Sequence, residues 1–182
     1  MTARPLPDPS TTTAPRPDAG GVAAARAAAT RDPTPGDPAP GDLAPDDATL
    51  PPLRTVGWVN VRDGRLLAVR TTGKDRFFMP GGKVEPGESD ADALVREIHE
   101  ELGVRLDPAS VRPGFVAEAP GHGLGGRVVR MHCMYAEPEP GSPEPAPSAE
   151  IAELAWLTPA DAHRVPPAGR IVLDRLAGVL AG

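Results

Sequence analysis

The sequence predicts an α/β domain that follows a disordered tail. Runs of β-branched and aromatic residues, typical of strands, lie on both sides of a strongly marked helical segment, and a second amphipathic helical segment lies near the C-terminus. A chain of 182 residues has room for one domain of common size and some additional length. We therefore expect one α/β domain over residues 53–182.

The additional length lies in residues 1–52, where proline and alanine dominate and aromatic residues are absent. Such a composition buries too little apolar area to offset the entropy that is lost when the chain is ordered. We therefore expect residues 1–52 to form a disordered tail.

The domain should begin with a β-hairpin. Residues 55–61 and 65–70 have the composition of strands, and Asp63-Gly64 between them is a strong turn signal. The first strand carries Trp58, which we expect in the core or in the wall of a pocket.

A short strand over residues 76–79 should end at Pro80, because proline has no N–H to donate to a strand ladder. Gly81 and Gly82 follow directly. Without side chains, these two residues let the backbone turn and approach a ligand closely.

A helix should follow between Ser89 and Gly103. Ser89 is a capping residue with Asp92 as its reciprocal acid, and Gly103 suits the left-handed conformation that ends many helices. Helical spacing places one apolar stripe along this segment, formed by Ala91, Leu94, Val95, Ile98 and Leu102.

The remaining elements are expected from similar signals. Strands are predicted over residues 104–106, 115–119, 128–136 and 151–157, with the second and third forming a hairpin around a glycine-rich connection. Thr158-Pro159-Ala160-Asp161 marks a helix start. A final amphipathic helix over residues 170–180 should turn Ile171, Val172, Leu176, Val179 and Leu180 toward the core.

Composition and charge exclude several classes of protein. A net charge of -6 argues against binding a nucleic acid polymer, which needs a concentrated basic face. No apolar stretch is long enough to span a membrane, and a single cysteine, Cys133, cannot form an internal disulfide. We therefore expect a cytoplasmic protein, either monomer or homodimer, that acts on a small molecule.

Three glutamates on the predicted helix, Glu97, Glu100 and Glu101, fall on the side away from the apolar stripe. Glutamates on a helix usually form a solvated face. Here acids three and four residues apart repel one another near the negative end of the helix. Arg96 can offset Glu100 but cannot neutralise all three carboxylates, so a divalent cation is the more economical explanation.

The stretch from Gly82 to Val104 resembles the signature of the Nudix hydrolases. That signature has nine specified positions, and the residues that match it here are Gly82, Glu88, Arg96, Glu97, Ile98, Glu100, Glu101, Gly103 and Val104. The resemblance implies an α/β/α sandwich around a mixed β-sheet. It also implies hydrolysis of a nucleoside diphosphate linked to another group, usually with Mg²⁺, although Mn²⁺ is possible.

The resemblance further implies a role for each acid of the signature. Glu97, Glu100 and Glu101 would be catalytic and would hold the metal together with a backbone carbonyl of the Gly81-Gly82 turn. Glu88 and Arg96 would brace the loop against the helix. Family members differ in which acid accepts the proton of the attacking water, and the candidates here are Glu97, Glu100, Glu101, Glu137, Glu139, Glu144 and Glu150.

The substrate is less constrained by the sequence. Residues placed to contact it are Arg70, Lys83, Phe78 and Arg130, although exposed arginines and lysines are commonly only solvated. Small members of the family are often MutT-like nucleoside triphosphate pyrophosphohydrolases, so the resemblance favours this activity for the chain. The alternatives are an ADP-ribose or nucleotide-sugar pyrophosphatase, and a nucleotide-sensing module that binds without hydrolysis.

Overall fold

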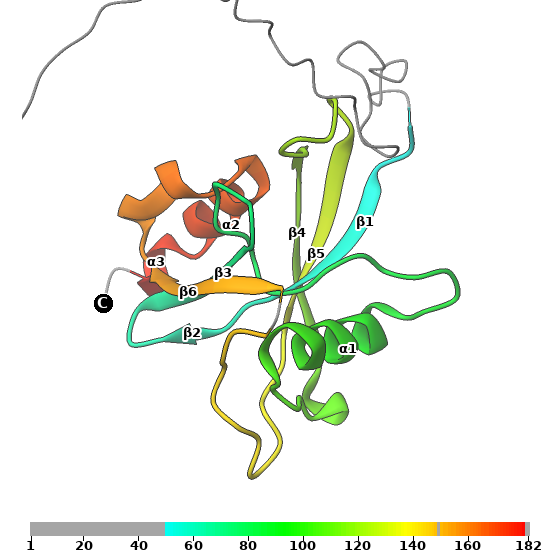
Figure 1. Ribbon diagram of the computed structural model, residues 1–182, viewed down its shortest axis with the longest axis vertical. Helices are drawn as coiled ribbons and strands as arrows, with labels where there is room; N and C mark the ends of the chain where they lie inside the picture. The colour runs from blue at the N-terminus through cyan, green and yellow to red at the C-terminus, as the bar shows by residue number, and fades with distance from the viewer. Residues whose placement is uncertain (1–49, 149, 181–182) are drawn as a thin grey trace, which may run out of the picture. The chain divides into compact units, whose positions relative to one another are not determined.

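The computed structural model describes residues 50–148 and 150–180. Most of the predicted tail over residues 1–52 lies outside the described residues. Two three-stranded sheets lie between helix α1 (Asp90–Leu102) on one side and helices α2 (Pro167–Arg175) and α3 (Ala177–Leu180) on the other (Figure 1). The expected α/β/α sandwich is confirmed, with the β layer divided into two sheets.

The first sheet has the strand order β1-β5-β4. Strand β1 (Leu53–Trp58) is parallel to β5 (Val128–Tyr135), and β5 is antiparallel to β4 (Arg112–Pro120). The predicted β4–β5 hairpin is confirmed. A parallel pair needs a long crossover, and here the crossover contains two strands of the second sheet, helix α1 and strand β4.

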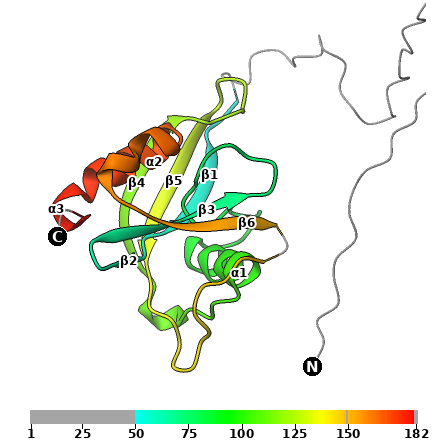
Figure 2. The same cartoon turned by 60° about the vertical axis from the view of Figure 1, so that its left-hand side comes forward.

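The second sheet has the order β2-β3-β6 and is antiparallel, with β2 (Val61–Arg62), β3 (Arg65–Thr71) and β6 (Ile151–Leu157). Figure 2 shows its strands crossing those of the first sheet steeply. The Asp63-Gly64 turn is confirmed, and both residues have positive φ, 50° and 67°.

Residues 55–61 were predicted to pair with residues 65–70 as the first arm of a hairpin, and this prediction is wrong for most of the segment. Only Val61–Arg62 pairs with β3, while β1 pairs with β5. The chain changes partner at Val59, whose N–H donates to the Met134 carbonyl at 2.8 Å. The strands expected over 76–79 and 104–106 are reduced to single bridges, Val69 to Phe78 and Leu106 to Pro138.

Strand β3 separates two apolar cores. Its Leu66 and Ala68 face the core beneath α2 and α3, and its Leu67 and Val69 face the core beneath α1. Because side chains alternate along a strand, all four are buried. Burying one leucine in this way contributes about 1.5–3 kcal/mol, so β3 anchors both helical layers to the sheet.

Trp58 is 1% exposed and belongs to the core beneath α1, as expected. Its indole Nε1 donates to the Ala136 carbonyl at 3.0 Å. The buried N–H is therefore satisfied, and β1 is joined to the chain that follows β5.

The C-terminal helix departs from its prediction. The helix begins earlier, at Pro167, and it breaks at Leu176, so that α2 and α3 replace the single helix over 170–180. Val172, Leu176 and Leu180 are buried as expected, but Ile171 and Val179 are 37% and 61% exposed. The buried stripe at Val172, Leu176 and Leu180 is therefore narrower than predicted, and Ile171 and Val179 lie outside it.

The capping signature before this helix is present: Thr158 and Asp161 form a capping box at the start of the 3-10 helix η3 (Pro159–Arg164). Within the described residues, no helix is long and apolar enough to cross a membrane.

Candidate active site

Helix α1 begins and ends where its sequence predicts. The Ser89 side chain accepts the Asp92 N–H at 3.1 Å, and its hydroxyl donates to the Asp92 carboxylate at 2.6 Å. Gly103 ends the helix with a φ of 67°. The buried face consists of Ala93, Leu94, Ile98 and Leu102, with Val95 packed at its margin. Ala91 was expected in this stripe but is not among the buried residues, and Ala93 is buried instead.

The turn at Gly81 and Gly82 is fixed against strand β1. The Val56 N–H donates to the Gly82 carbonyl at 2.9 Å, and the Trp58 N–H donates to the Pro80 carbonyl at 2.8 Å. Gly81 has a φ of 133°, and a Cβ there would overlap the backbone of Val56. Glycine at residue 81 is therefore required both by its backbone conformation and by the close approach of β1.

Helix α1 brings two of its glutamates to this turn. The Glu101 carboxylate accepts the Gly81 N–H at 2.9 Å. The Glu97 carboxylate lies so close to Gly82 that any side chain at residue 82 would overlap it. Glu100 points further outward, since its side chain is 59% exposed. Two of the three predicted metal-binding glutamates thus lie against the two glycines.

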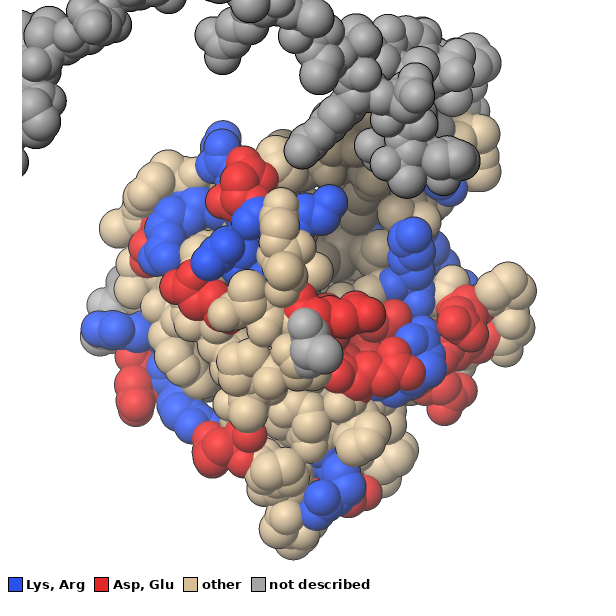
Figure 3. Space-filling view, in the orientation of Figure 1, with Lys and Arg blue, Asp and Glu red and all other residues tan. Residues whose placement is uncertain are grey.

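The electrostatics of Glu101 indicate a concentration of negative charge. Burial, together with the like charges of Glu97, Glu150 and Glu100, raises the pKa of Glu101 to about 7, although its hydrogen bond from Gly81 opposes the shift. Figure 3 shows acidic side chains gathered over α1 beside a hollow in the surface. A bound cation would favour the ionised form of such a carboxyl.

Arg96 joins the helix to the loop before it. Its guanidinium binds both oxygens of Glu88 at 2.9 Å and donates to the Lys83 carbonyl at 3.2 Å. Glu88 also accepts the Glu85 N–H at 3.0 Å. The hydrogen bond from Arg96 is the main cause that lowers the pKa of Glu88 to about 2. This is the contact that a bracing role requires.

Arg96 also binds Glu97 at 2.9 Å and Glu100 at 3.3 Å. Over residues 50–148 and 150–180, no three His, Cys, Asp or Glu side chains are gathered closely enough to hold a metal ion. The oxygen ligands nevertheless suit a hard divalent cation. Burial is the main cause of the raised pKa of Glu101, and such a cation would offset the neighbouring negative charges that add to it. Arg96 binds one oxygen of Glu97 and one oxygen of Glu100, so the second oxygen of each carboxylate is not engaged by Arg96.

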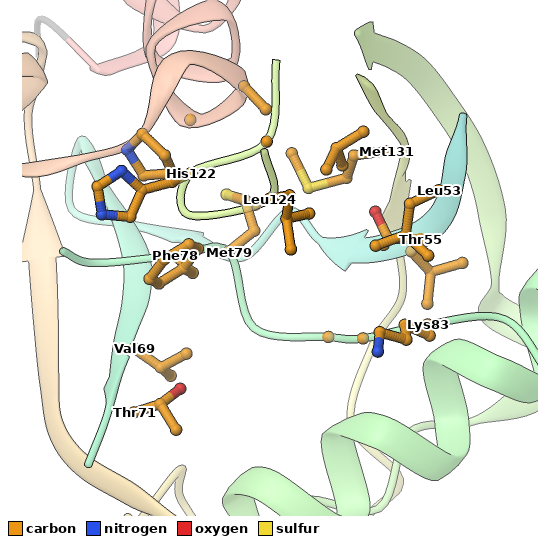
Figure 4. Close-up of a pocket in the computed structure, with 18 of the residues that line it drawn as sticks. Leu53, Thr55, Val69, Thr71, Phe78, Met79, Lys83, His122, Leu124 and Met131 are labelled. Atoms are coloured by element: carbon orange, nitrogen blue, oxygen red, sulfur yellow. The ribbon is translucent and has the colours of Figure 1, made fainter. Parts of the chain in front are cut away.

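A cavity of about 320 Å³ opens beside the two glycines (Figure 4). Gly81, Gly82 and Glu101 line it, as do Lys83 and Phe78, two of the predicted substrate contacts. Its remaining walls come from β1, β3 and the loop after it, β5, the β4–β5 connection and the start of α2. A site at the end of such a cavity can receive a small molecule whose reacting group reaches the carboxylates.

The other two predicted substrate contacts are not in the lining of this cavity. Arg70 pairs with Glu153 at 2.7 Å, and Arg130 pairs with Glu118 at 2.6 Å. Lys74, in contrast, lies in the lining. Arg70 and Arg130 lie directly opposite Glu153 and Glu118 on their neighbouring strands, so strand pairing directs both arginines to these carboxylates.

The candidates for the general base are also separated by the fold. Glu139 and Glu144 form ion pairs with Arg105 and Arg62, and Glu137 lines a different cavity. Glu150 is close enough to Glu101 for its charge to raise the pKa of Glu101. Outside the helix, Glu150 is therefore the candidate that the fold brings to the site.

One polar cluster near the site has no counterpart among the predicted residues. Asp90, in the first turn of α1, binds both Arg54 of β1 and His132 of β5 at 2.6 Å. These contacts tie the start of α1 to the first sheet. The three residues come from separate segments, and no local signal in the sequence identifies Asp90 as their common partner.

Comparison with known proteins agrees with this geometry. The NUDIX domain model matches residues 51–176. The chain is 33% identical over 118 residues to the CTP pyrophosphohydrolase of Escherichia coli (strain K12), covering 63% of this chain and 82% of that protein. It is 31% identical over 116 residues to a MutT-like protein of Streptomyces ambofaciens, covering 62% and 70% of the two chains.

Among solved structures, a putative nudix hydrolase family member from Chromobacterium violaceum matches with a TM-score of 0.56 and 26% identity, over 71% of this chain and 80% of that chain. The region that the NUDIX domain model matches contains the whole of helix α1 and the glycine turn. The chain belongs to the NUDIX family, and it is a pyrophosphohydrolase.

Proposed function

We propose that the chain hydrolyses a nucleoside triphosphate to the monophosphate and pyrophosphate with the help of Mg²⁺ or Mn²⁺. The observation that carries this proposal is the placement of Glu97 and Glu101 against Gly82 and Gly81 at one end of a cavity. The similarity to a CTP pyrophosphohydrolase supports a nucleoside triphosphate as the substrate.

The metal would be held by Glu97, Glu100 and Glu101 with a backbone carbonyl of the glycine turn. When bound, such an ion neutralises charge on the diphosphate and helps to orient the attacking water. Arg96 and Glu88 would keep the glycine loop and α1 in register, because their paired hydrogen bonds span the two segments.

The remaining charged groups of the site have complementary tasks. Lys83 and Lys74 line the cavity and would contact phosphate oxygens. Glu150, near Glu101, would accept a proton from the attacking water. These assignments place the cations on the walls of the cavity and the carboxylates at the end where the anhydride is cut.

The test is the Glu97→Gln variant, assayed with CTP, an oxidised deoxyguanosine triphosphate, ADP-ribose and a nucleotide sugar in the presence of Mg²⁺ or Mn²⁺. We expect turnover to fall by more than about 100-fold, because even indirect partners of metal ligands contribute about 10- to 100-fold. Glu85→Gln is the matched control, since Glu85 lies in the same signature with an exposed side chain. Near wild-type turnover by Glu97→Gln would refute the role of Glu97.

The same panel separates the alternatives. Turnover restricted to ADP-ribose or to a nucleotide sugar would replace the triphosphate as substrate. Metal-dependent binding of a nucleotide, measured by calorimetry without any product, would indicate a sensing module. A purely structural acidic helix predicts no increase in stability with Mg²⁺ or Mn²⁺, because a ligand that binds only the folded state must stabilise it.

A further inference from the structure

The cavity differs chemically along its length. One end holds Lys83, Glu101 and the two glycines, whereas much of the remaining lining is apolar: Leu53, Met79, Leu124, Val129, Met131 and Ala168. Figure 4 shows His122 and Phe78 together on the opposite side of the cavity from Lys83. His122 is thus one of the polar side chains of this lining, together with Thr55, Thr71 and Lys74.

His122 is attached to a different segment from Phe78. It lies on the connection between β4 and β5, and its Nε2 is 2.9 Å from the Oδ1 of Asp75 on the loop after β3. The rings of His122 and Phe78 have centroids 6.3 Å apart and are tilted by 53°. The Asp75–His122 pair therefore holds the β4–β5 connection beside the loop that carries Phe78.

At its far end the connection is held by Arg127, whose Nε donates to the Pro51 carbonyl at 3.0 Å. The backbone bonds of the connection are internal, with Gly121 donating to the Arg127 carbonyl at 2.8 Å and Arg127 to the Leu124 carbonyl at 2.9 Å. Gly123, Gly125 and Gly126 have positive φ. Within the described residues, the side chains of residues 121–126 make one hydrogen bond, which joins His122 to Asp75.

We propose that His122, positioned by Asp75, is a specificity-determining residue that holds the base of the nucleotide together with Phe78. This inference rests on the proposed function. A planar base can stack on an aromatic ring without regard to its identity. His122 adds a polar contact, because its Nδ1 is not engaged by Asp75 and can bond to the edge of a base.

The test compares His122→Ala and Asp75→Ala with Glu118→Ala in the full chain. Glu118 is the matched control, because it lies on the same hairpin, forms an exposed ion pair with Arg130 and does not line the cavity. The substrates are CTP and ribose 5′-triphosphate, which lacks a base. Calorimetry with CTP carrying a methylene group between the α and β phosphorus atoms measures binding independently of hydrolysis.

For His122→Ala we expect KM for CTP to rise about three- to tenfold, the range for one lost hydrogen bond. For Asp75→Ala we expect a rise of about two- to fivefold, because the pair is exposed to solvent. Values of kcat should stay within about twofold for both variants. KM for ribose 5′-triphosphate should not change, and Glu118→Ala should match the wild type with both substrates.

An equal rise in KM for both triphosphates, or no rise at all, would overturn the assignment of His122 to the base. If the wild type hydrolyses no triphosphate but binds the methylene analogue, and His122→Ala weakens that binding, the proposed function fails and this inference stands. If the wild type neither binds the analogue nor hydrolyses CTP or the oxidised deoxyguanosine triphosphate, both fail. Thermal unfolding of each variant checks that the exposed substitutions leave the fold intact.

Discussion

Gly82→Ala would test whether the Glu97 carboxylate occupies its position because residue 82 has no side chain. A Cβ at residue 82 would overlap the carboxylate of Glu97. Gly82 does not have positive φ, so alanine should add no backbone strain. The substitution therefore acts on Glu97 rather than on the turn itself.

The size of the effect follows from what Glu97 would lose. Its carboxylate is the end of a flexible side chain and can rotate away, giving up the 2.9 Å hydrogen bond from Arg96. The loss of one partly exposed bond between charged groups should lower the free energy of unfolding by about 1 kcal/mol. Displacing Glu97, the proposed metal ligand, should lower kcat/KM by more than about 100-fold. Activity should thus fall far more than stability.

The assay combines kcat/KM for CTP across a titration of Mg²⁺ with urea unfolding of the metal-free protein. Gly178→Ala is the control, because nothing lies within 4 Å of an added Cβ there and the residue is helical. We expect this control to retain activity and to gain up to about 1 kcal/mol in stability. If Gly82→Ala kept near wild-type kcat/KM at every Mg²⁺ concentration, the reasoning about Glu97 would be refuted.

Three further predictions concern individual side chains. The pKa of Glu101 is raised to about 7, so between pH 4.5 and 7 the folded state binds this proton more tightly than the unfolded state. The metal-free protein should therefore lose about 3 kcal/mol of stability as pH rises through this range. Urea unfolding should show this loss, and Glu101→Gln should abolish it. Glu88→Gln should weaken metal affinity by about 10- to 100-fold, measured by calorimetry, with unchanged affinity arguing against bracing. Burial raises the pKa of Cys133 to about 12, so a thiol reagent at pH 8 should react only after unfolding, and fast reaction with the native protein would contradict this.

Local signals in the sequence were sufficient for helix α1 and its surroundings. Ser89 and Gly103 act on the backbone within a few residues, so their effect does not depend on distant contacts. The turn at Asp63-Gly64 is local in the same sense. The signature placed Glu97 and Glu101 near the two glycines because its spacing includes both the turn and the helix.

The partner of each strand depended on distant parts of the chain. Strand β1 has the composition of a hairpin arm, but β5 competes for its backbone, and that parallel pairing requires most of the intervening chain. The same reason explains Arg70 and Arg130, whose carboxylate partners are cross-strand neighbours. Register cannot be read from a strand by itself, so their ion pairs could not be predicted.

The family signature, the helix that carries the acids and the glycine turn against which they lie can all be read from local sequence. The walls that surround that turn were set by the folding of distant segments onto one another, that is, by the tertiary structure. It brought together Phe78, His122 and Asp75, which come from two loops joined by a hydrogen bond between residues 47 positions apart. The end proposed to cut the anhydride is encoded by spacing within one segment, whereas the end proposed to receive the rest of the substrate is assembled from segments that meet only on folding.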